Sequence, residues 1–117
     1  MKKICSIILL ISSSIQAWYY QTVTNATPYD LEVKWVYDGC RPDTHMVKSG
    51  DHRKNNGYWC DLNRIDFHTK DKKKSGSFNH KDYRFNYRGN SLWITIIEQE
   101  GKLIVDKKKI VTGKNSL

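Results

Sequence analysis

The side chains best suited to binding chemistry in this sequence are basic. Two lysine clusters and one pair of arginines stand out: Lys70, Lys72, Lys73 and Lys74; Lys107, Lys108 and Lys109; Arg84 and Arg88. Residues four apart on a strand point to the same face, so both arginines are expected on one polar surface. If these groups converge, they predict a site for phosphate, sulfate or carboxylate groups. The alternative is a solvated surface in which lysines protect strand edges.

Aromatic residues are the second group that could bind a ligand. The chain has 4 Trp, 7 Tyr and 3 Phe. Most of them alternate with polar residues, which predicts core positions. Adjacent strand residues point to opposite faces, so Trp18-Tyr19-Tyr20 and Tyr58-Trp59 should each leave a ring outside the core. Trp59 is our candidate for stacking on sugars or bases, and packing around the disulfide is the alternative.

No pattern in the sequence predicts catalysis or a bound metal. The four histidines, His45, His52, His68 and His80, lack the spacing of zinc ligands. The pairs Asp43/His45 and Asp51/His52 are only weak candidates for acid–base work. Neither a nucleophile elbow nor a glycine-rich phosphate loop is present. We therefore expect a protein that is not an enzyme and needs no cofactor, with a small hydrolase as the least favoured alternative, because triads assemble in space.

The first 17 residues have the order of a secretory signal peptide. Lys2 and Lys3 precede an apolar run, and small and polar residues lead to Ala17, the expected cleavage position. The run is much shorter than the roughly 20 residues that span a bilayer, and no second run of that length follows. The sequence predicts a secreted or periplasmic protein without a transmembrane segment in the mature chain.

Removal of the signal leaves two cysteines, because Cys5 leaves with it. An even cysteine count in an exported chain predicts a disulfide, here Cys40–Cys60. A closed loop of this length contributes about 3 kcal/mol in the chain-entropy model. The mature part keeps 18 of the 20 Lys and Arg residues and all 12 Asp and Glu residues, a net charge of +6. Residues 18–113 suit a single domain, and residues 114–117 are expected to fray.

Hydrophobic alternation with period two dominates the mature chain. The stretch 31–37 places Leu31, Val33, Trp35 and Tyr37 on one face, which predicts a half-buried strand. Residues 92–97 are apolar on both faces and predict a central strand covered on both sides. Further strands are expected at 18–24, 65–69, 83–87, 103–105 and 110–111.

Turn residues separate these strands at short intervals. Gly89-Asn90-Ser91 and Glu100-Gly101-Lys102 predict hairpin turns, and the polar segment 70–82 predicts an exposed loop. About seven short antiparallel strands predict an all-β protein, a single small β-sandwich of immunoglobulin-like type or a small barrel. Asn25-Ala26-Thr27 is a glycosylation sequon that matters only in a cell that glycosylates its secreted proteins.

These features favour a non-enzymatic binding module for an anionic polymer or a glycan. The residues expected to bind are Lys72, Lys73, Lys74, Arg84 and Arg88, with Trp59 stacking on the ligand. The alternative is a structural or protein-interaction domain, in which an edge strand pairs with another chain.

Overall fold

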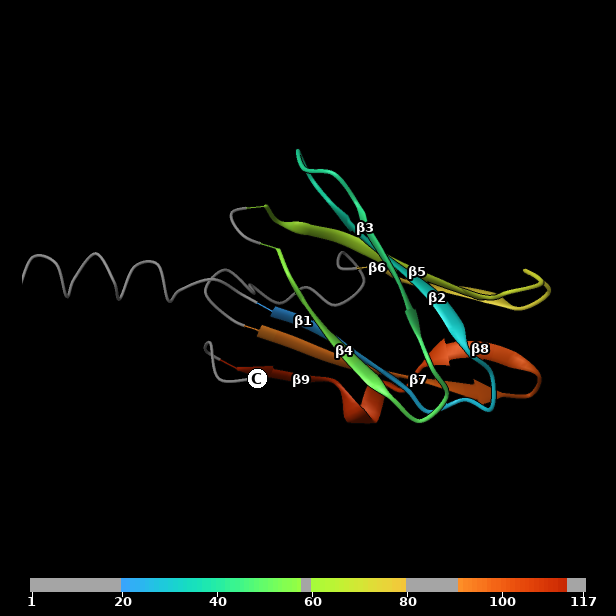
Figure 1. Ribbon diagram of the computed structural model, residues 1–117. Coiled ribbons are helices and arrows are strands. Elements are labelled where there is room, and N and C mark those ends of the chain that lie inside the picture. The colour runs from blue at the N-terminus through green and yellow to red at the C-terminus, as the bar shows by residue number, and fades with distance from the viewer. Residues whose placement is uncertain (1–19, 58–59, 80–90, 114–117) are drawn as a thin grey trace, which may run out of the picture.

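A computed structural model describes residues 20–57, 60–79 and 91–113 of the chain. Nine strands form two sheets that pack face to face (Figure 1). The predicted all-β sandwich is thus confirmed, with two more strands than expected. The predicted signal peptide (residues 1–17) and the tail (residues 114–117) lie outside the described residues.

Sheet A contains the first strand and the strands nearest the C-terminus. Strand β1 pairs in parallel with β7 and antiparallel with β4, and β8 and β9 pair antiparallel with β7. The 3₁₀ turn η2 interrupts the edge between β8 and β9. In order across the sheet, the strands are β4 (His52–Asn56), β1 (Tyr20–Asn25), β7 (Ser91–Gln99) and β8 (Lys102–Val105). After β8, the chain forms η2 (Lys107–Lys109) and then β9 (Val111–Gly113), which also pairs with β7.

Sheet B is antiparallel throughout. Its order is β3 (Asp43–Val47), β2 (Leu31–Tyr37), β5 (Leu62–Thr69) and β6 (Ser75–Asn79). Strand β2 is central and has the clearest alternation in the sequence. Its inward-facing residues are buried, as predicted: Leu31, Val33, Trp35 and Tyr37.

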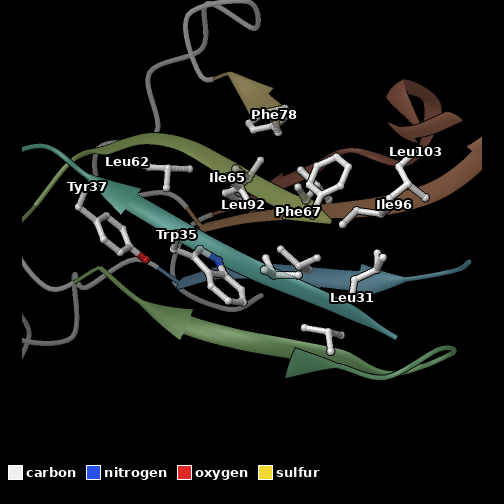
Figure 2. Packing of buried hydrophobic residues seen from close by; sticks show 14 residues of the cluster. Leu31, Trp35, Tyr37, Leu62, Ile65, Phe67, Phe78, Leu92, Ile96 and Leu103 are labelled. Carbon is white, nitrogen blue, oxygen red and sulfur yellow. The ribbon is translucent and has the colours of Figure 1, made fainter. Parts of the chain in front are cut away.

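The core lies between the two sheets and is made of the inward-facing residues of both (Figure 2). Trp35 and Phe67 are its largest fully buried side chains. The Trp35 Nε1 atom donates a hydrogen bond of 3.0 Å to the Gln21 carbonyl, so the indole N–H is satisfied inside the core. This bond also ties sheet B to sheet A.

Three segments form strands that alternation did not predict, namely β3, β4 and β6. Strand β4 reads His-Arg-Lys-Asn-Asn, and only Asn55 is buried in it. Strand β6 lies inside the segment 70–82, so the expectation of an exposed loop throughout that segment was wrong. Among its described residues, 70–74 form a turn, and β6 pairs with β5 and buries Phe78. All three are edge strands, and pairing with a neighbour decides their structure more than their polar composition does.

Strand β7 is central in its pairing, as predicted, but its two faces differ. Leu92, Ile94 and Ile96 point into the core and are buried. Trp93 and Ile97 point away from it and are only half-buried, so the expected cover on both faces is incomplete.

The predicted Cys40–Cys60 disulfide is present, with the two Cα atoms 6.2 Å apart. A disulfide is typical of proteins that fold outside the cytosol. Within the described part of the chain, no helix has the length and apolar character needed to cross a membrane. The strand expected at 83–87 and most of the turn at Gly89-Asn90-Ser91 fall outside the described residues.

Candidate functional site

The basic segment expected to bind anions is the tight turn between β5 and β6. Lys72 and Lys73 are exposed there, and Lys72 has a left-handed backbone with φ of 62°. The Asp71 carboxylate accepts hydrogen bonds from the Thr69 hydroxyl (2.6 Å) and the Lys73 backbone N–H (3.0 Å). These two bonds, the hydroxyl bond first, lower the pKa of Asp71. The carboxylate therefore holds the turn together and remains charged beside the lysines.

Lys74 points away from this turn and joins a network with two other loops. Its Nζ atom lies 3.0 Å from Glu98 Oε2 and donates to the Gly101 carbonyl at 2.7 Å. The Tyr29 hydroxyl donates to the same Glu98 oxygen at 2.7 Å. Lys74 is thus engaged by protein groups, which makes it a poor anion-binding residue.

The network shifts the pKa of each of its members. The hydrogen bond from Tyr29, followed by that from Lys74, lowers the pKa of Glu98. The same contacts with Glu98 raise the pKa of Lys74 and of Tyr29. All three shifts favour the state in which Glu98 is ionised, Lys74 is charged and Tyr29 is neutral. This arrangement is typical of a structural ion pair.

The predicted basic clusters do not form one patch within the described residues. The turn after β5 shares its end of the molecule with Asp71, Glu98 and Glu100, which offset its lysines. The cluster Lys107–Lys109 belongs to η2, on the edge of sheet A between β8 and β9. The other candidates, Arg84, Arg88 and Trp59, lie outside the described residues, so their roles stay predictions.

A different surface, the outer face of sheet A, brings aromatic and basic side chains together. In the ladders of this sheet, Thr22 lies opposite both Lys54 and Trp93, and Trp93 lies opposite Val111. Residues that are directly opposite share a face of the sheet. Tyr20 is two residues from Thr22 and lies on the same face. We call this surface the platform, and its residues are Tyr20, His52, Lys54, Trp93 and Val111.

Contacts between neighbouring strands fix the side chains of the platform. The Lys54 ammonium lies 4.7 Å from the centre of the Tyr20 ring, a cation–π contact. The His52 and Trp93 rings are 5.7 Å apart. Trp93 Nε1 donates to the Thr24 hydroxyl at 2.6 Å, which sets the orientation of the indole. His52 and Lys54 are exposed, Val111 is 46% exposed, and the two aromatic rings are partly exposed.

The described strand residues that face outward from sheet A include no Asp or Glu. The strand residues of the platform are therefore basic and aromatic, and the carboxylates nearest to them, Asp51 and Asp106, lie just beyond the ends of β4 and β8. Sequence reasoning did not select Trp93, because residues 92–97 are apolar on both faces and predicted a fully covered strand. The sequence signal for an outward-facing aromatic ring was that Trp93 alternates with Leu92 and Ile94 and so falls on the opposite face of the strand.

The histidines and their acidic neighbours do not gather into a metal centre in the described part of the chain. No group of three His, Cys, Asp or Glu side chains there could hold a metal ion. Asp43 accepts a hydrogen bond from the Asn55 amide (3.0 Å), while the His45 ring packs edge-on against Trp35 at 5.8 Å. His80 lies outside the described residues.

The comparisons with known proteins support the fold alone. No protein-family model matches the chain, and no curated protein is significantly similar to it in sequence. A solution NMR structure of a protein from Eubacterium rectale is similar in fold, with a TM-score of 0.54 and 14% sequence identity. The match covers 77% of this chain and 87% of that one.

Proposed function

We propose that this protein is an exported, non-enzymatic binding module that holds an acidic carbohydrate against the outer face of sheet A. The observation that carries the proposal is the platform, where Tyr20 and Trp93 lie beside Lys54 on a face whose described strand residues include no carboxylate. Aromatic rings stack on the apolar faces of sugars, and an ammonium group attracts carboxylate or sulfate substituents. The exposed lysines of η2, Lys107–Lys109, border this face and extend its positive charge.

Binding to heparin, to single-stranded DNA and to neutral dextran at 50 and 200 mM salt tests the proposal. We expect heparin to bind, and the Lys54→Gln variant to weaken it by about threefold at low salt and by less at high salt. Tyr20→Ser should weaken heparin binding at both salt concentrations, because stacking is not screened. The matched control is Lys70→Gln/Lys73→Gln, which removes two exposed lysines of the turn after β5 and should leave the affinity unchanged.

Two results would contradict the proposal. If the turn variant weakens heparin binding more than Lys54→Gln does, the site is the basic turn. If single-stranded DNA binds as tightly as heparin and Tyr20→Ser has no effect, the protein attracts polyanions without recognising sugars.

The alternative function, pairing of an edge strand with another chain, has weaker support. Strand β8 is a mainly apolar edge strand, but it begins with Lys102, and Lys107–Lys109 follow it. Lysines at a sheet edge oppose pairing with a second strand. Sedimentation at increasing protein concentration tests the homotypic form, and self-association at micromolar concentration is the result that would favour it.

A further inference from the structure

A groove of about 540 Å³ lies where the edge of sheet B meets the edge of sheet A. Its described lining comes from β6, β7, β8, η2 and Ile110. Near one end, the two edges are in close contact. The backbones of Gly76 and Leu103 are so near that a Cβ atom on Gly76 would lie only 2.6 Å from the Leu103 carbonyl oxygen. The groove itself follows the next residues of β6, Ser77–Asn79, and the rest of β8.

The lining of the groove is mainly apolar. Phe78 and Leu103 belong to the hydrophobic core. In Figure 2, Phe78 lies on β6, and Leu103 lies at the end of the core beside η2. Ile97, Ile104 and Ile110 are half-buried and continue the apolar surface. Grooves of this size and character are typical of sites for small molecules.

The charged groups of the described lining gather at one end of the groove, whereas Ser77, Asn79 and Gln99 are its polar uncharged members. Lys107 and Lys108 line it there, and both side chains are exposed. The carboxylate of Asp106 is also in the lining, but its Oδ1 atom accepts a hydrogen bond of 3.1 Å from the Lys108 backbone N–H and caps η2. The described lining at this end therefore holds two ammonium groups and one carboxylate, and that carboxylate caps η2.

From this arrangement, we infer that the groove binds a small amphiphile with one apolar chain and one anionic head group. The chain would lie against Phe78, Leu103 and Ile110, and the head group beside Lys107 and Lys108. Burial of the chain supplies most of the binding free energy, and the two lysines set its orientation and its charge preference. The groove shares the η2 lysines with the border of the platform, but its apolar lining contains none of the platform residues, so this inference does not depend on the proposed carbohydrate ligand.

Titration of the purified, oxidised protein with dodecanoate, dodecanol and dodecyltrimethylammonium tests the inference, with all ligands below their micelle concentrations. We expect saturable binding of dodecanoate, weaker binding of dodecanol and the weakest binding of the cation. Backbone amide resonances of Phe78, Val105 and Lys108 should shift in the NMR spectrum, while those of Thr22 and Lys54 on the platform should not.

Variants separate the roles of charge and shape. Lys107→Gln/Lys108→Gln should weaken dodecanoate by roughly fivefold and leave dodecanol unchanged, because the lost contacts are partly solvent-exposed ion pairs. Lys48→Gln/Lys70→Gln is the matched control and should affect neither ligand. Asn79→Trp adds an indole at an exposed groove position and should weaken both dodecanoate and dodecanol.

Several outcomes would overturn the inference. These are absence of saturable dodecanoate binding, equal affinity for the anion and the cation, or resonance shifts confined to residues outside the groove. Resonances of the groove that move with protein concentration alone would show that a second copy of the chain occupies it instead.

Discussion

Asn25 shows how one side chain can determine the shape of several loops. Its Nδ2 group donates to the carbonyls of Tyr29 (2.6 Å) and Val47 (2.9 Å), and its Oδ1 atom accepts from the backbone N–H and the hydroxyl of Thr27. The side chain is completely buried. It therefore connects the loop after β1 to the end of β3. The asparagine of the glycosylation sequon is thus a buried structural residue of the folded domain.

Replacement of this amide by a carboxylate should destabilise the protein strongly. Asn25→Asp removes both N–H donors and places a charge beside two carbonyl oxygens. We expect the free energy of unfolding to fall by about 2–4 kcal/mol, measured by urea denaturation at pH 7. Asn79→Asp makes the same change at an exposed position and should cost less than about 0.5 kcal/mol. Equal stability of the two variants would show that Asn25 has no such role.

The strained backbone of Lys72 gives a prediction of opposite sign. A left-handed conformation is unfavourable for residues with a Cβ atom and accessible to glycine. Lys72→Gly should raise the free energy of unfolding by about 0.5–1 kcal/mol, even though it removes a surface charge. At Lys73, where φ is not positive, the same substitution should lower it by about 0.5 kcal/mol. Thermal unfolding of both variants measures the difference, and a loss of stability in both would contradict the argument.

At the scale of elements, the sequence predicted strands well where alternation is strong and core-facing. The inward-facing residues of β2 and of β7 are buried as expected. Strands β4 and β6 could not be read this way, because few of their residues face the core and hydrogen bonds to β1 and β5 define them. The platform was missed for a related reason, since it depends on which strands become neighbours, and local sequence does not contain that information.

The ion pair between Glu98 and Lys74 links elements that are far apart in sequence, and its effect should depend on pH. The pKa of Glu98 is lower in the folded state than in the unfolded chain. Its contribution to stability is therefore complete above the unfolded pKa of about 4.3 and disappears as the pH falls through the folded pKa. Glu98→Gln should destabilise the protein at pH 7, and the difference from the wild type should vanish near pH 2.

Urea denaturation of both proteins from pH 2 to pH 7 measures this difference. Glu100→Gln, which changes an exposed residue of the adjacent turn, is the control and should show a smaller effect at pH 7. A difference between Glu98→Gln and the wild type that does not change with pH would exclude the ion pair as its cause. On the alkaline side, the pKa values of Lys74 and Tyr29 are raised, so their contribution should be lost as the pH rises above about 10.

At the scale of the whole molecule, the two ends of the sandwich are closed by different interactions (Figure 1). At one end, hydrogen bonds of Asn25 and Lys74 join four turns. These turns connect β1 to β2, β3 to β4, β5 to β6, and β7 to β8. At the other end, the disulfide joins the turn after β2 to the segment before β5. The platform lies on sheet A and the groove at its edge, and both are located between these two ends. The rigidity of both ends therefore determines how well the two surfaces are preorganised for binding.

The disulfide should therefore contribute a large part of the global stability. It closes a loop with a sequence separation of 20, which corresponds to about 3 kcal/mol. Reduction of the wild type, or the variant Cys40→Ala/Cys60→Ala, should lower the Tm by more than about 10 °C, since a domain of this size loses several degrees for each kcal/mol. Calorimetry with and without reductant measures both effects. The Tm of the alanine variant should not change with reductant, because a change would show that reductant acts on something other than this disulfide. An unchanged Tm in the reduced wild type would contradict the prediction, since it would mean that non-covalent contacts alone hold this end closed.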